Sequence, residues 1–241
     1  VSHSDTLMLE FFSALTWNPE HCNIDDFLPE FCRARYGARK ERFLPVWKLV
    51  LPVACWCGFH RNEYEYSALN LIGSNDYGNL YTNLTPENIV SLKALEKRSS
   101  ATLASLPEIF RMLSAVAAAG VEGEFEFRDL IDLARVSAAR LHLAVLTRMT
   151  LMCEAWRDGA ENQETITALL ELSERALTLL SSIVGTHEDF SLRHSLDELE
   201  KNPLCNPEFE PTLKGNAENN YCRSWHIYEL DSSLLLPEFR V

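Results

Sequence analysis

Apolar residues recur at intervals of three and four along most of the chain, which is the spacing of one face of an α-helix. The clearest such stretch lies in the second half, where the apolar positions are Phe127, Ile131, Ala134, Ala138, Leu141, Val145, Met149, Met152 and Trp156. Gly159 follows this stretch, and glycine is favoured just beyond the last turn of a helix. The pattern predicts a long amphipathic helix that ends near Gly159.

Two more long helices are predicted on either side of this one. Thr85-Pro86-Glu87 is typical of a helix start, because threonine favours the N-cap and proline the first helical position. We expect this helix to reach Gly120 and to be kinked at Pro107, which lies inside the apolar pattern. A third helix is predicted from about Asn162 to Val184, with Gly185 as its stop.

Shorter helices are expected in the first third of the chain. Asn23 and the acidic pair Asp25-Asp26 open one of them, and Gly37 stands where a left-handed cap ends a helix. Another helix should begin near Ala38, and Pro52 should kink it or end it.

The predicted fold class is all-α, an antiparallel bundle of two or three long helices plus several shorter helices. A helix of roughly 33 residues is about 50 Å long, and long helices joined by short connections pack as antiparallel neighbours. The mean apolar step is nearer 3.6 than 3.5 residues, which favours a globular bundle over a coiled coil. The part after Thr186 contains several prolines and should carry only short helices.

Charge and cysteine content narrow the possible partners. The chain has 22 Lys and Arg against 35 Asp and Glu, a net charge of −13, which disfavours nucleic acid and a polybasic membrane contact. No apolar run approaches the roughly 20 residues that span a bilayer. The cysteines are scattered and odd in number, seven in all, which favours reduced thiols and a cytoplasmic location.

The densest group of reactive side chains is "CWCGFHRNEYEY", residues 55–66. Cys55, Cys57 and His60 could bind zinc, but the usual C-x-x-C spacing is absent, so buried thiols are the favoured interpretation. Glu63 and Glu65 could form a glycosidase carboxylate pair, but residues two apart point to different sides of a helix. A solvated face is the favoured interpretation of these acids.

Two clusters of aromatic and polar residues are candidates for binding a sugar. A sugar ring stacks its C–H face on an aromatic ring and directs its hydroxyls to polar groups. The first candidate set is Trp56, His60, Asn62 and Tyr64, and the second, within residues 214–231, includes Asn219 and Tyr221 beside Trp225. Ordinary core and loop packing remains the alternative for both clusters.

Signatures of known catalysts are missing from the sequence. The chain has no Gly-x-Ser-x-Gly, phosphate loop, dinucleotide fingerprint or His-Glu-x-x-His, and no cofactor is predicted. We expect His142, at the centre of a long helix, to be packed rather than catalytic.

The stretch "EFFSALTWNPEHCNIDDFLPEFCRARYG", residues 10–37, resembles the segment that leaves the catalytic barrel in α-glucuronidases and related glycoside hydrolases. In those enzymes an apolar helix, a Trp-Asn-Pro turn and an acid-rich helix start lead into an α-helical C-terminal region. The match is carried by Trp17, Asn18, Pro19, Asp25, Asp26, Phe31, Tyr36 and Gly37.

A second stretch, "FRDLIDLARVSAARLHLAVL" at residues 127–146, is similar to a helix in the C-terminal domain of α-N-acetylglucosaminidases. The shared pattern is Asp-Leu-x-Asp-Leu-x-Arg. The matching positions are Arg128, Asp129, Leu130, Asp132, Leu133 and Arg135.

These resemblances imply a barrel-exit helix and joint in residues 1–37 and a C-terminal α-helical domain in residues 38–241. The catalytic carboxylates of such enzymes lie on the barrel, so no residue here inherits a catalytic role. The implied function is a helical domain that packs on the barrel and lines the carbohydrate site, without catalysis of its own. The alternative is an independent acidic helical module that binds a protein or forms a homo-dimer.

The implied barrel also gives an expectation for the first helix. Its apolar residues should be exposed, mobile or repacked in a dimer when the barrel is absent. These residues are Leu7, Leu9, Phe11, Phe12 and Leu15.

Overall fold

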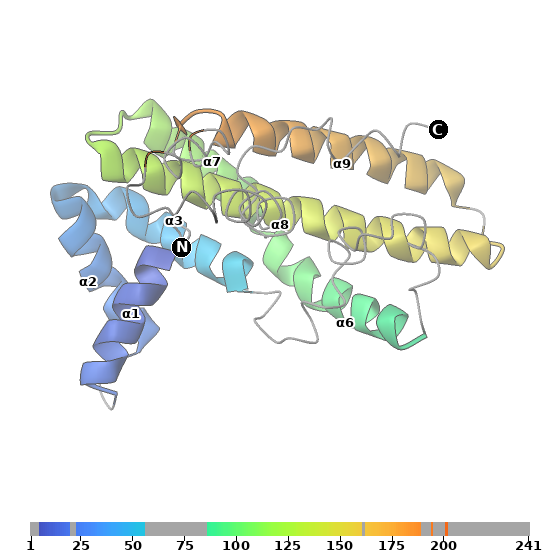
Figure 1. Ribbon diagram of the computed structural model, residues 1–241, viewed down its shortest axis with the longest axis horizontal. Helices are drawn as coiled ribbons and strands as arrows, with labels where there is room; N and C mark the ends of the chain where they lie inside the picture. Colours follow the sequence, from blue (N-terminus) through green and yellow to red (C-terminus); the bar gives the residue numbers. More distant parts are fainter. Residues whose placement is uncertain are drawn as a thin grey trace. The chain divides into compact units, whose positions relative to one another are not determined.

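The computed structural model describes residues 5–19, 23–55, 86–160 and 162–188, together with His194 and Lys201. Nearly all of these residues are helical and none is in a strand, so the predicted all-α fold class is confirmed (Figure 1). The chain divides into two compact units, and the boundary between them passes through the longest helix.

The first unit contains Val1–Trp56 and Ala101–Ser137. Its helices are α1 (Asp5–Trp17), α2 (Ile24–Tyr36), the 3₁₀ turn η1 (Gly37–Arg39), α3 (Lys40–Cys55), α7 (Leu106–Ala118) and the first part of α8 (Glu124–Arg157). The buried apolar residues of this unit include Leu28, Phe31, Phe43, Val46, Trp47, Val50, Ile109, Leu113, Ile131 and Leu133.

Helix α2 begins and ends where its capping residues predict. The side chain of Asn23 accepts a hydrogen bond from the Asp26 backbone N–H at 3.0 Å, and Asp25 and Asp26 stand in the first turn. Gly37 follows the last helical residue with φ of 56°, and its N–H bonds to the carbonyl of Arg33. The predicted helix between Asn23 and Gly37 is therefore confirmed.

Proline positions account for two differences from the predicted helices. One kinked helix was expected from Pro86 to Gly120, but the chain forms α6 (Pro86–Leu103) and α7, with a break before Pro107. Proline lacks an N–H and its ring collides with the carbonyl four residues earlier, so the chain leaves the helix and starts again with Pro107 in the first turn. Helix α3, by contrast, contains Pro52 and continues to Cys55, so of the two outcomes expected at Pro52, a kink or an end, the helix does not end there.

The second unit contains Cys57–Ser100 and Ala138–Val241. Its described helices are α6 up to Ser100, α8 from Ala138, and α9 (Gln163–Val184), which matches the third predicted helix. Helix α9 runs antiparallel to α8, because Asn162 donates to the Met152 carbonyl at 3.0 Å and Ser173 lies 3.0 Å from His142. The long helix predicted to end near Gly159 is α8, with 34 residues.

Helix α6 also packs on the second half of α8. Leu92 forms a buried cluster with Leu151, and Ile89 packs against it. An ion pair between Glu96 and Arg148, 2.7 Å from nitrogen to oxygen, joins the two helices at their surface.

The apolar residues of α1 divide between the interior and the surface. Leu9 and Phe12 are 56% and 54% exposed, as the resemblance predicts, and Trp17 is 87% exposed. Leu7 is fully buried, so the expectation of exposure is wrong for that residue. Phe11 is half-buried and its ring lies 5.4 Å from that of Phe27.

Gly37→Ala should destabilise the protein by about 2 kcal/mol, because side chains rarely adopt this positive φ. Nothing lies within 4 Å of the added methyl group, so the loss would come from the backbone alone. Urea unfolding followed by circular dichroism measures the change, with Ala38→Gly in the same exposed turn as the control. Equal transition midpoints for wild type and Gly37→Ala would contradict this account.

Candidate functional site

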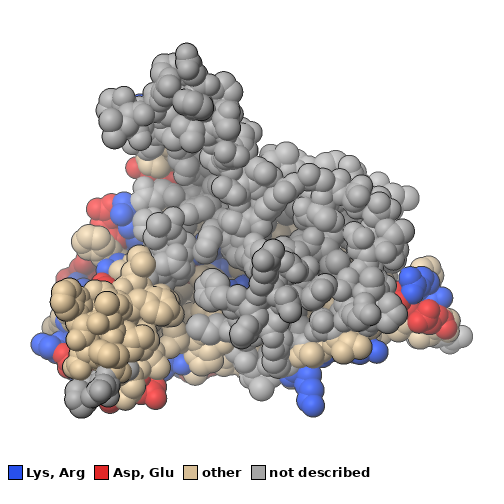
Figure 2. All heavy atoms as spheres, turned by 60° about the horizontal axis from the view of Figure 1, so that its bottom comes forward, with Lys and Arg blue, Asp and Glu red and all other residues tan. Residues whose placement is uncertain are grey.

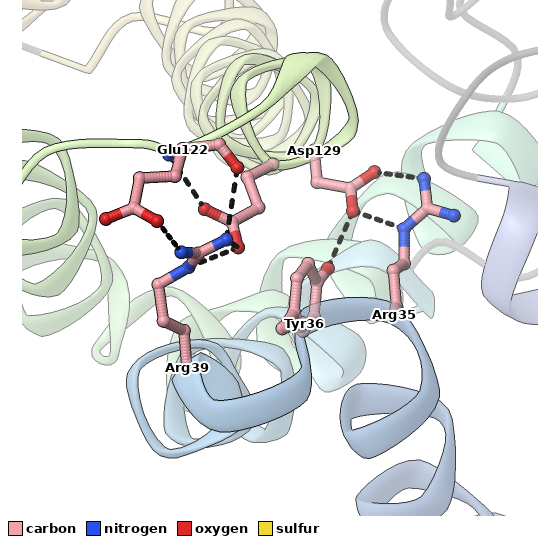
Figure 3. Close-up of polar contacts among 6 residues, drawn as sticks. Arg35, Tyr36, Arg39, Glu122 and Asp129 are labelled. Atoms are coloured by element: carbon pink, nitrogen blue, oxygen red, sulfur yellow. Dashed lines mark hydrogen bonds and ion pairs between the residues drawn. The ribbon is translucent and has the colours of Figure 1, made fainter.

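A buried group of polar side chains joins the end of α2 to the start of α8 within the first unit (Figure 3). Asp129 is 4% exposed and its carboxylate accepts from three donors. Arg35 donates to it through Nε and through Nη2, the latter at 2.8 Å, and the Tyr36 hydroxyl donates at 2.7 Å. The planar guanidinium therefore meets the carboxylate in a bidentate pair, which is the strongest geometry for these groups.

Helix α3 adds a fourth member to this group. The indole N–H of Trp47 donates to the Tyr36 hydroxyl oxygen at 2.9 Å, so that hydroxyl accepts one hydrogen bond and donates another. The ring of Tyr36 stacks on Phe43 with 4.0 Å between centroids. We call Arg35, Tyr36, Trp47 and Asp129 the Asp129 cluster.

The Asp129 cluster is closed off by aromatic rings. The Arg35 guanidinium carbon lies 5.9 Å from the centre of the Phe31 ring and 5.4 Å from that of Phe125, within the range of cation–π attraction. Phe31 also contacts Trp47 edge to face, with 5.6 Å between centroids. The charged pair thus lies between the buried ring of Phe31 and the exposed ring of Phe125, with the Asp129 carboxylate itself buried.

A second ion pair lies beside this cluster in Figure 3. Arg39 of η1 donates to Glu126 at 2.6 Å and also pairs with Glu122. Glu126 is buried and accepts a hydrogen bond from the backbone N–H of Glu122 at 3.1 Å, which ties down the turn before α8. Two arginines near the end of α2 therefore meet carboxylates near the start of α8.

Burial raises the pKa of two groups at this position, the Tyr36 hydroxyl and the neighbouring Cys32 thiol. Burial, reinforced by the negative charge of Asp129, raises the pKa of the Tyr36 hydroxyl far above its ordinary value. The same two causes raise the pKa of the neighbouring Cys32 thiol to about 12. The hydrogen bond to Asp129 is the main cause that raises the pKa of Arg35. Neither a phenolate nor a thiolate forms here near neutral pH, so the cluster is built to hold helices together rather than to react.

Asp132 and Arg135, one turn further along α8, form another buried pair. Their side chains are 3% and 2% exposed, and Arg135 Nε lies 3.0 Å from Asp132 Oδ1. Leu130 and Leu133 lie in the core between these polar positions. The stretch of α8 that resembles the glucosaminidase helix is therefore mostly interior.

None of the sequence-predicted sugar-binding residues is among the described residues. The sugar-binding candidates are Trp56, His60, Asn62, Tyr64, Asn219 and Tyr221. Cys57 of the possible zinc site and the acids Glu63 and Glu65 also lie outside the described residues. They remain predictions. The free cysteines in the described part include Cys32 and Cys153.

Arg35 and Trp47 were not singled out by the sequence, although both belong to the Asp129 cluster. The available signal was the repeated acid at steps of three on an otherwise apolar helix face, Glu126, Asp129 and Asp132, since buried acids require partners. This pattern predicts that the buried acids have positively charged partners, but it does not identify which arginines these partners are.

Within the described ranges, no group of three or more His, Cys, Asp or Glu side chains is arranged to hold a metal ion. No helix in that part of the chain has both the length and the apolar character to cross a bilayer. Comparison with known proteins found no matching protein family, no matching curated protein and no matching solved structure.

Asp129→Asn should destabilise the protein by about 3 kcal/mol, because it leaves Arg35 charged and largely buried without its counter-ion. Urea unfolding measures the loss. The matched control is Glu30→Gln, which removes the exposed partner of Arg33 and should leave the unfolding midpoint unchanged. Similar midpoints for the two variants would show that Asp129 does not hold the helices together.

Tyr36→Phe should cost about 1–2 kcal/mol, because it leaves the buried N–H of Trp47 without an acceptor while the ring stack on Phe43 is kept. The double variant with Asp129→Asn should lose less than the sum of the two single losses, since both changes weaken or remove the same hydrogen bond. Additive losses in the urea titrations would mean that Tyr36 and Asp129 act independently.

Proposed function

We propose that this chain is an α-helical domain of a barrel-type glycoside hydrolase, packing on the catalytic barrel and lining the carbohydrate site without catalysing hydrolysis itself. The resemblance of two separate stretches, residues 10–37 and 127–146, to such enzymes is the starting point. The all-α fold agrees with the helical region that follows the barrel in those enzymes.

The observation that carries the proposal is the contact between the two stretches. Tyr36, near the end of the first, donates a hydrogen bond at 2.7 Å to Asp129 of the second, although 93 residues separate them. Arg35 binds the same carboxylate. Two accidental similarities would have no reason to meet in one buried cluster, whereas two parts of an inherited domain would.

The proposed role of this cluster is to fix the start of α8 against α2 and α3. A surface that lines a substrate site needs helices whose positions do not vary, and a saturated ion pair among aromatic rings supplies that rigidity. Because its polar members bond to one another, the Asp129 cluster serves as support and the sugar contacts are assigned elsewhere.

Helix α1 supplies the proposed contact with the barrel. Leu9, Phe12 and Trp17 are large, apolar and exposed along this helix. In Figure 2, a broad uncharged surface appears at the lower left, the side on which Figure 1 draws α1 and α2. Exposed apolar residues in such a group are typical of a surface that another protein surface covers.

A second candidate function is an acidic helical module that binds another protein. The same exposed residues of α1 favour it, and the net charge of −13 suits a basic partner surface. The two functions differ in whether the chain responds to sugar.

Glucuronate or N-acetylglucosamine, titrated separately into the protein at millimolar concentrations, should change its tryptophan emission if the two aromatic clusters contact sugar. Trp56→Phe and Trp225→Phe should each reduce the change. Trp156→Phe, which alters an exposed tryptophan of α8 outside both clusters, is the matched control and should retain it. The chain alone should not cleave nitrophenyl glycosides.

The outcomes separate the two candidate functions. A partner-dependent increase in mass with no response to either sugar would favour the interaction module. Turnover of a nitrophenyl glycoside that is lost in Glu63→Gln or Glu65→Gln would overturn the assignment of catalysis to another domain.

A further inference from the structure

A buried histidine connects α8 to α9 in the second unit. His142 lies near the middle of α8 and is 3% exposed. Its Nε2 atom is 3.0 Å from the hydroxyl oxygen of Ser173 on α9. Ser173 is itself buried, so this is an interior polar contact between two long antiparallel helices.

The surroundings of this contact are apolar. On α8, the residues about one turn from His142 are buried and carry no charge: Ala138, Ala139, Val145 and Leu146. On α9, the buried residues following Ser173 are Ala176, Leu177, Leu180 and Val184. The imidazole is therefore enclosed by hydrocarbon on both helices.

Most of the charged groups near His142 in the two helices are exposed or paired. On α9, Glu171, Glu174 and Arg175 are exposed. On α8, Arg135 pairs with Asp132, and Arg140, two residues from His142, is half-buried. Burial is the cause that lowers the pKa of His142 to about 4, and no carboxylate offsets it.

Hydrogen-bond counting leads to the same conclusion independently. A neutral imidazole has one N–H donor, and the contact with Ser173 satisfies Nε2 in either tautomer. The Nδ1 atom is buried and has no hydrogen-bond partner within the described part of the chain. Protonation puts a donor on both nitrogens, so it would leave a charged, buried N–H without an acceptor.

We propose that His142 makes the packing of α9 on the second half of α8 sensitive to acid, so that protonation of its imidazole releases α9. The neutral ring fits the closed interface and the imidazolium does not. This contact lies outside the Asp129 cluster and does not depend on the proposed carbohydrate function.

The sign of the effect follows from the direction of the shift. The pKa of His142 in the packed state is depressed below the ordinary value of 6.5. As the pH falls, the open state, in which α9 is released from α8, therefore takes up a proton at a higher pH than the packed state does. The closed interface is fully stable above about pH 6.5 and loses stability as the pH falls from there toward 4. Between pH 8 and pH 5 the equilibrium constant for opening should rise roughly 30-fold.

Hydrogen–deuterium exchange of α9 tests the proposal. After correction for the intrinsic rate of exchange, α9 amides that exchange through this opening should be roughly 30-fold less protected at pH 5 than at pH 8. His142→Gln should abolish this difference, because its amide can still donate to Ser173 but does not titrate. His187→Gln, a change just after α9, is the matched control and should keep the difference.

A spectroscopic titration covers the case in which His142→Gln does not fold. The imidazole signal of His142 in the wild-type protein should stay neutral through pH 5.5 and change only when α9 loses protection. A His142 signal that titrates near 6.5 while α9 stays protected would overturn the proposal. So would an equal acid response of α9 in wild type and His142→Gln.

Discussion

The first unit depends on the hydrogen bonds and the ion pair that the buried carboxylate of Asp129 accepts from its neighbours. An isolated charge in that position would be expensive, and its three donors, two from Arg35 and one from Tyr36, remove the penalty. Because Tyr36 also accepts from Trp47, this one carboxylate ties the end of α2 to the start of α8 and, through Tyr36, to α3. The rings of Phe31 and Phe43 pack directly against members of this cluster.

The chemistry of this cluster limits what it can contribute to function. Its members bond to one another, and burial raises the pKa of Tyr36 and of the neighbouring Cys32, so neither of these two groups ionises near neutral pH. Its contribution is rigidity. In the proposed function, recognition of sugar or protein is therefore assigned to other surfaces, such as the exposed apolar residues of α1.

The two units use buried polar residues in different ways. In the first, the Arg35 cation and the Asp129 anion form a largely buried ion pair. In the second, His142 faces hydrocarbon with one nitrogen bonded and the other buried without a partner in the described residues. A group that is satisfied in only one protonation state makes packing conditional, whereas a saturated pair makes it permanent.

The sequence by itself determined the helical class and several helix ends, because caps and apolar spacing act over a few residues. Asn23, Gly37 and Gly185 stand at helix ends as predicted. The effects of Pro107 and Pro52 were harder to predict from the sequence, since both prolines favour a break locally but only Pro107 interrupts its helix. Tertiary structure alone decided that Arg35 would neutralise Asp129, a residue 94 positions away. No local pattern encodes that pairing, because it depends on which helix faces are brought together when the chain packs.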